Sequence, residues 1–506
     1  TTTTFGSHAT FAPSINLTSG SYPGHPDPAG LLRATNLTLN NSLLQPHWNA
    51  ANNIAVNQTF DVLHYNGAQS GIFNPTVVSP LTFDTTYTGS SNADVLLQLT
   101  GVNYTHVGGD ENQRSLESYL NNFYSNNGTT IILDPTGNLA PGINLAQLTS
   151  DLSNDGASAL NNLIHDEYSQ QNVQTYWSQQ AFINSIADNL RNDRNMGAGG
   201  ATSFALNQTN VSSTGMQLSS LRQAMTSIPG GLGMASDVGN SSTGVWAGYT
   251  GAHQHTDADS GIGSSDWNSS SDGFVLGYTG GGEKFSWGFA AGHQKSTFDS
   301  SNSTGNQEGY NAGLYASWKS KSTYLNAVLG YGKYDNSVYG GSEANFDTHG
   351  MSAYLELGKR LKDDSKGGLS PYASVLWTRI KNGSANDSNG FNLESGSNNI
   401  YTTALGLRYN HRMFDKGDTL KGGWTAGLAW LHQFGDTAFP VNGNYSSTSP
   451  FSFQTESTPL SGNAAQVQLG AYGRIHGNLI GFAGYQGTFG SNQKINGVDA
   501  GVGYQF

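Results

Sequence analysis

The sequence contains no cysteine. Disulfide bonds and thiolate metal sites are therefore excluded, and the redox compartment stays open. Charged residues are also scarce, at 11% of the 506 residues, whereas glycine occurs 66 times and tyrosine 24 times. This balance departs from an ordinary cytosolic enzyme and is typical of outer-membrane and cell-surface proteins. We expect no cofactor and no metal.

The chain also lacks any long apolar run. A membrane helix needs about 18 consecutive apolar residues, and no such stretch occurs. Any membrane crossing must therefore use a closed β-barrel, which pairs every backbone group. No basic and apolar signal peptide opens the sequence either, so we expect Thr1 to begin a mature or trimmed product. The formal net charge of -13 argues against nucleic acid as a partner.

What the chain does have is a strict alternation over residues 244–506. Around residue 288 one face would carry Phe285, Trp287, Phe289 and Ala291, and the other Ser286, Gly288, Ala290 and Gly292. Near the end the two faces would be Val498, Ala500, Val502, Tyr504 and Phe506 against Asp499, Gly501, Gly503 and Gln505. A soluble barrel buries its apolar side chains inside. Here the second face is small and polar, which indicates a wet lumen with lipid outside.

This pattern predicts a barrel of about twelve antiparallel strands. The predicted strands are 244–256, 270–279, 284–298, 308–319, 322–335, 346–362, 369–382, 397–413, 419–435, 463–476, 478–488 and 493–506. Short turns alternate with longer polar loops at 257–269, 299–307, 336–345, 383–396 and 436–462. Since bacterial barrels place short turns in the periplasm, the first strand rises outward and Phe506 returns to the periplasm.

The rest of the chain divides into three further predicted units. Residues 1–107 carry short apolar runs separated by turns, which favours a β-solenoid, with a small sandwich as the alternative. Residues 108–195 place apolar residues at helical spacing and predict a compact helical linker domain. Residues 196–243 are rich in Gly, Ser and Asn and predict a segment threaded through a pore. The fold class is thus mainly β, with a helical linker and lumen segment between two β units.

Four charged residues would face the barrel lumen: Glu356, Arg408, Arg474 and Asp499. A charge inside a barrel must be paired or hydrated. Two interpretations stay open, because these residues could grip a threaded segment or could simply be solvated. Five tryptophans at outward positions are interpreted as interface aromatics, namely Trp287, Trp318, Trp377, Trp424 and Trp430.

The sequence resembles the autotransporters, the self-exporting proteins of type V secretion in Gram-negative bacteria. The resemblance is carried by "GVWAGYTGAH" at 244–253, "DGFVLGYTGGGEKFSWGFAAGHQ" at 272–294 and the ending "GVGYQF". Segments "TFDVLHYNGAQSGIFNPTV" at 59–77 and "ENQRSLESYL" resemble the end of a β-helical passenger and the junction after it.

The resemblance implies a twelve-stranded translocator with a helix in its lumen, drawn from residues 176–243. It also implies that Tyr504 and Phe506 form the aromatic signal read by the outer-membrane assembly machinery. The chain would lie in the bacterial outer membrane with its N-terminal half extracellular.

No hydrolase signature accompanies this resemblance. G-x-S-x-G does not occur, and "GDEN", "GDTL" and "GDTA" lack the serine of a G-D-S motif. His253, His255, Asp257 and Asp259 alternate at a strand end, which favours a wetted rim over a metal site. In some autotransporters the passenger is released beside an asparagine of the lumen helix, but Asn189, Asn192 and Asn195 do not match that motif. We expect no enzymatic step in this chain.

The function that follows is display or secretion of the chain's own N-terminal passenger. The alternative is a structural or adhesive surface protein that self-associates or binds through residues 1–107. A diffusion porin is a third hypothesis, and the long N-terminal half argues against it. Expected partners are outer-membrane lipid, the assembly machinery and neighbouring surface proteins or matrix, and no nucleic acid.

Overall fold

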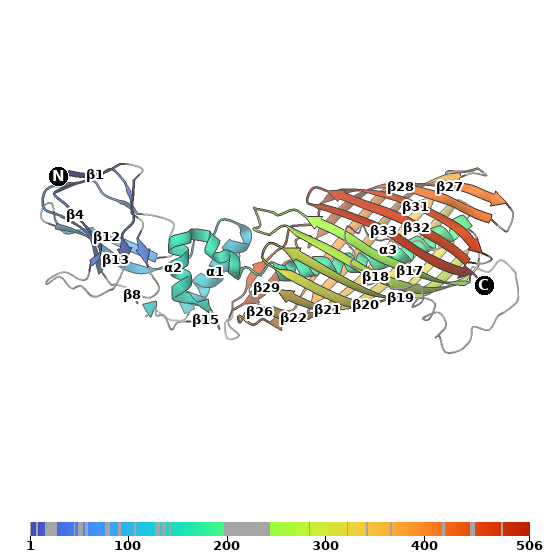
Figure 1. Ribbon diagram of the computed structural model, residues 1–506, viewed down its shortest axis with the longest axis horizontal. Coiled ribbons are helices and arrows are strands. Elements are labelled where there is room, and N and C mark those ends of the chain that lie inside the picture. Colours follow the sequence, from blue (N-terminus) through green and yellow to red (C-terminus); the bar gives the residue numbers. More distant parts are fainter. Residues whose placement is uncertain are drawn as a thin grey trace.

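The computed structural model describes residues 2–505 apart from 7–8, 16–27, 45, 49–53, 56–58, 76–80, 90–92, 106–107, 127–131, 134–137, 141–142, 197–242, 283, 321, 341–342, 365–366, 417–419, 446–450 and 477–478. An elongated molecule results, with an N-terminal β unit, a helical region and a C-terminal barrel in line (Figure 1). Among the described helices, none is both long and apolar enough to span a membrane.

The C-terminal barrel has twelve long antiparallel strands and is closed by pairing of the first with the last. They are β17 (Gly244–Thr256), β18 (Trp267–Gly281), β19 (Phe285–Ser300), β20 (Thr304–Lys319), β21 (Thr323–Tyr339), β22 (Glu343–Lys359), β24 (Gly367–Asn382), β27 (Gly396–Lys416), β28 (Leu420–Gly435), β31 (Asn463–His476), β32 (Leu479–Gly490) and β33 (Gln493–Gln505). The predicted barrel is confirmed.

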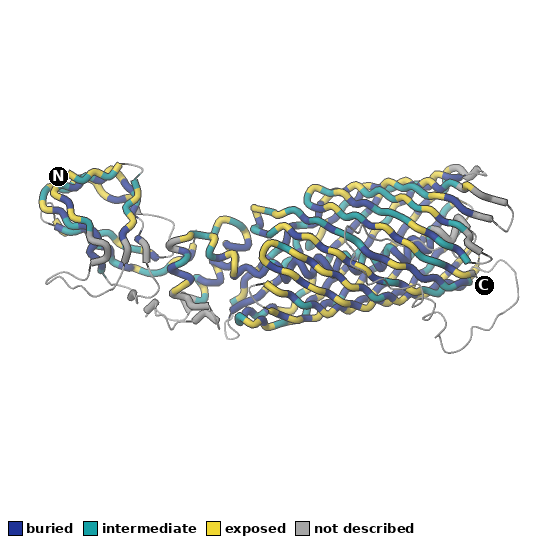
Figure 2. Tube along the Cα trace, viewed as in Figure 1, coloured by how far each residue is buried: buried dark blue, intermediate teal, exposed yellow. Residues whose placement is uncertain are grey.

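Burial in the barrel follows the alternation in the sequence. Phe285, Trp287 and Phe289 are exposed, whereas Ser286, Gly288 and Ala290 between them are buried. On the last strand, β33, Val498 and Tyr504 are exposed while Asp499 is buried. Exposed and buried residues accordingly alternate along β19 to β22, and Figure 2 shows this alternation on the barrel wall. The barrel wall therefore presents its apolar residues outward and its polar residues to the lumen, as lipid outside requires.

Two of the predicted loops are wrong. Residues 299–307 and 336–345 are mostly strand, because β19 and β20 are separated only by residues 301–303, and β21 extends to Tyr339. Polar residues continue the strands beyond the apolar belt, since backbone pairing there needs no apolar face. The long connections at this end are 257–266, 383–395 and 436–462. The last two carry the short strands β25 (Ala385–Asn386), β26 (Asn392–Leu393), β29 (Val441–Asn444) and β30 (Phe453–Thr455), and β23 (Lys362–Asp364) lies at the opposite end.

A 30-residue helix, α3 (Glu167–Met196), runs through the barrel lumen (Figure 1). It packs against β17 to β24. The predicted linker domain, 108–195, contains most of this helix, and the predicted lumen segment begins only at residue 176. Both boundaries are wrong, because the lumen helix begins at Glu167. Polar and apolar residues are mixed around the helix, with no single apolar stripe, so its spacing alone could not show that it lies in a barrel lumen. The predicted threading segment after it lies outside the described residues.

The helical region outside the barrel lies at the end with the long connections. It consists of α1 (Glu111–Asn126), α2 (Leu145–Asp155) and the 3-10 helix η1 (Gly156–Leu163), with β14 (Ile132–Leu133), β15 (Asn138–Ala140) and β16 (Ile143–Asn144). A capping box starts α1. Asp110 accepts the N–H of Gln113 at 2.8 Å, and the Gln113 side chain accepts the N–H of Asp110 at 3.3 Å.

The N-terminal unit combines parallel and antiparallel pairing. Its strands are β1 (Thr2–Phe5), β2 (Thr10–Phe11), β3 (Ser14–Ile15), β4 (Pro28–Ala34), β5 (Asn36–Leu39), β6 (Leu43–Leu44), β7 (His47–Trp48), β8 (Ile54–Ala55), β9 (Thr59–Tyr65), β10 (Gln69–Ser70), β11 (Asn74–Pro75), β12 (Leu81–Tyr87) and β13 (Ala93–Val102). Strand β5 lies parallel between β1 and β10, and β6 parallel between β2 and β11.

The last strands of this unit depart from the expected solenoid. β13 pairs antiparallel with both β9 and β12. Val95, Leu97 and Leu99 are buried, but Leu96 between them is only partly buried because it points to the other face of the sheet. The antiparallel sheet alternates sides, so a continuous inward run does not form. A solenoid over all of residues 1–107 is not confirmed.

Candidate functional site

The middle of α3 is held in the lumen by hydrogen bonds between uncharged polar side chains. Thr175 is bonded to Thr348 of β22 at 2.8 Å and accepts from Gln307 of β20 at 2.7 Å. Tyr176 reaches a third strand, at 2.8 Å from Thr402 of β27, which only β24 separates from β22. Buried polar groups are costly unless they are hydrogen-bonded. This network therefore bonds part of the polar surface of the helix to the barrel wall and fixes the rotation of the helix in the barrel.

Glycines on the inner wall allow α3 to approach β21 and β22 closely. A Cβ atom added at Gly330 would lie 2.5 Å from Cδ1 of Ile183, and one at Gly350 would lie 3.0 Å from Oε1 of Gln179. Such separations are below ordinary van der Waals contact. The small inward residues that marked a wet lumen in the sequence thus line a groove in the wall that accepts the helix.

Charged side chains hold the C-terminal end of α3. Arg191 donates from Nε to Oε2 of Glu356 at 3.0 Å and from Nη2 to the same oxygen at 2.5 Å. Asp188 accepts from Nη1 of Arg191 at 2.6 Å. Arg408 approaches Oε1 of Glu356 at 3.7 Å, with its guanidinium over the ring of Tyr372. Glu356 is fully buried, so its charge depends on these two cations.

Of the four predicted lumen charges, the structure brings Glu356 and Arg408 together and separates Asp499 from them. Asp499 is buried on β33, which lies opposite β22 in the closed strand order. It lies across from Gly484 of β32, where an added Cβ would come within 2.1 Å of Oδ1 of Asp499. The backbone of Arg474 is part of β31, and its side chain lies outside the described residues.

The two residues of the predicted assembly signal are the end of the closing strand. Tyr504 pairs with Val245 of β17 and with Leu479 of β32, and its side chain is exposed on the outer face. Phe506 lies outside the described residues. The position of Tyr504 at the seam of the barrel is compatible with its predicted role, which stays a prediction.

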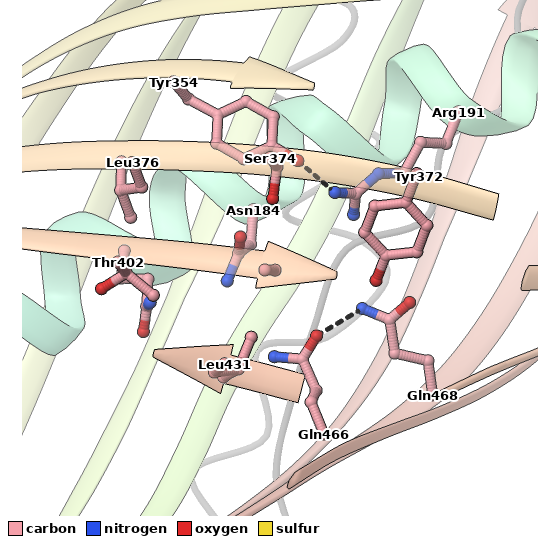
Figure 3. Close-up of a pocket in the computed structure, with 12 residues that line it drawn as sticks. Asn184, Arg191, Tyr354, Tyr372, Ser374, Leu376, Thr402, Leu431, Gln466 and Gln468 are labelled. Carbon is pink, nitrogen blue, oxygen red and sulfur yellow. Dashed lines mark hydrogen bonds between the residues drawn. The ribbon is translucent and has the colours of Figure 1, made fainter. Parts of the chain in front are cut away.

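A small cavity of about 40 Å³ lies beside the charged end of α3. Figure 3 shows Arg191 and Tyr354 on one side of it, and Gln466 and Gln468 on the other. A water molecule needs about 10–15 Å³ of such volume. The cavity has room for a few waters beside the helix, and its lining of amides and hydroxyls suits them.

At the other end of α3, the barrel mouth is closed by aromatic side chains from four parts of the chain. The ring of His165 stacks on Phe391 of the 383–395 connection at 4.5 Å, and Tyr445 of the 436–462 connection lies 5.5 Å from Phe391. Tyr119 of α1 joins them, because its hydroxyl accepts the N–H of Tyr445 at 3.0 Å. Aromatic pairs at such separations are mutually stabilising.

Polar bonds complete the closure of the mouth. Ser169 donates to the carbonyl of Phe439 at 2.8 Å and accepts the N–H of Ser457 at 2.8 Å. Asn112 of α1 donates to the carbonyl of Glu456 at 2.9 Å and accepts its N–H at 2.8 Å. The 436–462 connection is thus bonded both to the lumen helix and to the helical region outside the barrel.

Two titratable groups lie in this closure. Burial raises the pKa of Asp166 to about 7, although its carboxyl accepts the N–H of Ser265 at 3.1 Å. Burial lowers the pKa of His165, but the carboxylates of Glu167 at 2.7 Å and Asp387 at 3.8 Å more than offset this and leave the pKa raised. Both shifts mean that the closed mouth binds protons more tightly than the unfolded chain.

The alternating histidines and aspartates at the end of β17 form local pairs. His255 lies 3.1 Å from Asp257, and His253 lies 3.3 Å from Ser270. Among the described residues there is no group of three or more side chains placed to hold a metal ion.

Sequence reasoning missed Arg191 and the mouth cluster. Arg191 was visible as a lone cation three residues after Asp188, on a segment predicted as helix. Its partner Glu356 is 165 residues away. No local sequence pattern links the residues of the mouth cluster, because four separate segments supply Tyr119, His165, Phe391 and Tyr445.

Comparison with known proteins gives one family match. A family model described as the autotransporter beta-domain matches residues 245–486. Among curated relatives, an extracellular serine protease of Serratia marcescens is 24% identical over 288 residues, which is 54% of this chain and 27% of that protein. The uncharacterized protein YuaQ of Escherichia coli K12 is 30% identical over 161 residues, 28% of this chain and 12% of that protein. The chain thus spans less than a third of either relative.

Three solved structures are similar over about half of the chain. The beta domain of the Bordetella autotransporter BrkA is 20% identical, with a TM-score of 0.41 and coverage of 52% of this chain and 99% of that one. The NalP translocator domain of Neisseria meningitidis is 14% identical, with a TM-score of 0.42 and coverages of 52% and 88%. The AIDA-I transport unit of Escherichia coli is 17% identical, with a TM-score of 0.41 and coverages of 57% and 97%.

Proposed function

From the premise that residues 245–486 form an autotransporter beta-domain of the bacterial outer membrane, we propose that this chain exports and displays its own N-terminal region on the cell surface. The barrel is the anchor and the conduit. The domain division that we propose is a passenger remnant at 1–107, a helical linker that ends before α3, the lumen helix α3 itself, a threading segment that ends at 243, and the barrel at 244–506.

The observation that carries this proposal is the position of α3 in the lumen. Its N-terminal end is continuous with helices that pack at the barrel end with the long connections. In bacterial barrels the long connections are extracellular. A chain that enters the barrel from that side and continues into β17 has its N-terminal region outside the cell.

The closure of the lumen supports a completed export step rather than an open pore. An α-helix with its side chains is about 10 Å wide, comparable to the lumen of a twelve-stranded barrel. The cavity beside α3 has a volume of about 40 Å³, so a second chain does not fit in that cavity. The helix would therefore remain as a plug after the passenger has crossed.

The test is protease shaving of intact cells, followed by mass spectrometry of the outer membrane. Loss of residues before about 165, with survival of 244–506 as a heat-modifiable barrel, is the expected result. Protection of the N-terminal half in intact cells, with cleavage only after the outer membrane is permeabilised, would place that half in the periplasm and reject the proposal.

We also propose that this chain catalyses no reaction. One relative is an extracellular serine protease. This chain has neither a G-x-S-x-G motif nor a G-D-S motif. Incubation of the purified chain with a fluorophosphonate probe is expected to leave every serine unlabelled. Stoichiometric labelling of one serine, abolished by heating, would show that a hydrolase site exists.

A second candidate function is adhesion or self-association through residues 1–107. It is favoured by β12, which is an edge strand because it pairs only with β13 among the described strands. An open edge can accept a strand from another chain. If that occurs, surface-displayed protein should aggregate cells, and Thr85→Pro in β12 should abolish aggregation without loss of display. Unchanged aggregation in this variant would exclude the edge.

The proposed partners follow from the same architecture. Outer-membrane lipid contacts the exposed apolar belt, and the assembly machinery reads the C-terminal aromatic residues Tyr504 and Phe506. Deletion of Phe506 is expected to lower the amount of folded barrel in the membrane, measured by heat-modifiability. Neighbouring surface proteins or matrix remain candidate partners of residues 1–107.

A further inference from the structure

The outer face of the barrel changes from apolar to charged along one line near the long connections. On β21 the outward residues run from Leu325 and Leu329 through Tyr331 to Lys333. On β24 they run from Leu369 and Val375 through Trp377 to Arg379 and Lys381. The change from apolar belt to charge marks the outer boundary of the hydrocarbon region.

Two cations along this boundary have carboxylate partners on adjacent strands. Lys295 of β19 lies 3.1 Å from Glu308, which is also 2.8 Å from His293. Lys333 of β21 lies 2.9 Å from Asp347. These cations are compensated within the protein, so they offer little net positive charge to the membrane.

The two cations of β24 differ. Neither Arg379 nor Lys381 forms an ion pair with a carboxylate in the described part of the chain. Arg379 donates to the hydroxyl of Ser397 on β27 at 3.1 Å. Lys381 pairs in register with His349 on one side and Ser397 on the other. Both side chains are exposed on the outer face.

Further hydrogen-bonding side chains lie beside these cations, and aromatic side chains lie on the membrane side of them. Asn399 pairs in register with Arg379, and Trp377 pairs with Tyr401 one outward position closer to the membrane. Aromatic residues of this kind occupy the interface of outer-membrane barrels. The cations therefore lie at headgroup height, with guanidinium, ammonium and hydroxyl groups converging on one patch.

We propose that Arg379 and Lys381, with Ser397, Asn399 and His349 beside them, bind the phosphate of a phosphorylated glycolipid headgroup in the outer leaflet. Guanidinium and ammonium groups bind phosphate through short charge-assisted bonds. The position just above Trp377 selects a lipid phosphate over a free one, because the acyl chains then lie against the apolar belt beneath.

The test uses the purified full chain in detergent with two probes, bisphosphorylated lipid A and the same lipid without its phosphates. Bound lipid is measured by native mass spectrometry. Each basic residue near an anionic surface contributes about 1 kcal/mol, so Arg379→Gln with Lys381→Gln is expected to weaken binding of the bisphosphorylated lipid on the order of thirtyfold. The dephosphorylated lipid should bind the wild type and this variant equally.

The matched control is Lys295→Gln with Lys333→Gln, which removes two cations from the same boundary. It should weaken binding less than about threefold, because those cations are already paired. Equal loss in both double variants would mean a diffuse charge effect, and equal binding of the two lipids would mean that phosphate is not recognised. Either result overturns the proposal. If the β24 double variant does not form a heat-modifiable barrel, Lys381→Gln alone is compared with Lys333→Gln under the same criteria.

Discussion

Different kinds of interaction hold the two ends of the lumen helix. At the mouth, stacked rings and backbone hydrogen bonds from the 383–395 and 436–462 connections close over His165 and Ser169. At the other end, one buried ion cluster around Glu356 holds Arg191. Between them the contacts are uncharged hydrogen bonds and close packing on glycine.

This difference predicts how each end of α3 responds to the loss of a single side chain. The mouth depends on many groups from several segments, so loss of one leaves the others in place. The ion cluster depends on a single fully buried carboxylate, and removal of one partner of a buried pair leaves the others uncompensated. Four variants or conditions test this difference between the two ends of α3, and they follow in decreasing order of expected effect.

The largest effect is expected for Glu356→Ala. Arg191 and Arg408 would remain buried without a carboxylate between them, at a cost of about 3–5 kcal/mol. The lumen end of α3 should loosen, which planar bilayer recordings would detect as more frequent channel openings. Asp188→Asn keeps both bonds from Arg191 to Glu356, so it should open the channel less. Equal opening in the two variants would contradict a central role for Glu356.

At the mouth, Phe391→Ala should destabilise the closure by about 3 kcal/mol, because a fully buried ring is lost from the cluster. Proteases added to intact cells should then cleave the 383–395 connection faster, with little change in channel opening. Ile72→Ala, at a position 58% exposed in the N-terminal unit, is the control. A large rise in conductance from Phe391→Ala would show that the two ends are not independent.

In the middle of the helix, Gly330→Val should cost about 2 kcal/mol by overpacking against Ile183. The melting temperature of the folded barrel should fall, as followed by gel mobility on heating. Gly282 has open space around it, so Gly282→Val should leave the melting temperature unchanged. If both variants melt alike, the close approach of α3 to β21 is not what stabilises the plug.

The smallest effect is expected from pH, and only at the mouth. The pKa of Asp166 is raised to about 7 in the closed state, and that of His165 is raised as well. The closed state therefore binds more protons than the unfolded chain, and its stability falls as the pH rises from about 4 through 7. Glu167, Asp387 and Gln170 are the polar side chains that face this pair.

Hydrogen exchange of residues 165–170 should accordingly be faster at pH 8 than at pH 5, after correction for the intrinsic rate. Asp166→Asn should reduce the difference. The opposite trend, with slower exchange at pH 8, would mean that the charged form of Asp166 is the stabilised one.

Period-two alternation was sufficient to predict the barrel, because lipid outside and polar lumen inside impose opposite requirements on successive residues. It could not define where the strands end above the membrane. There β20 is polar on both faces, and Asp335, Asn336 and Ser337 interrupt the apolar pattern of β21, so loop and strand look alike in the sequence. The same limit applied to α3, whose polar helical pattern fits a solvated linker as well as a lumen.

For the site, the sequence identified Glu356 and Arg408 as lumen charges because alternation assigns each residue a face. It could not pair them, since strand register and the rotation of α3 decide which side chains meet. Asp499 is also buried, but it lies apart from these two residues because β33 is on the opposite wall.

The sequence by itself determined that a closed β-barrel with a polar interior forms. The alternation extends over residues 244–506, and strands satisfy their backbone groups in lipid only when the sheet closes. Only the tertiary structure decided what fills that interior and how. Arg191 meets Glu356, and Tyr119 meets Tyr445, across more than a hundred residues of chain. Such contacts depend on strand order, shear and the seating of a helix, and no local pattern encodes them.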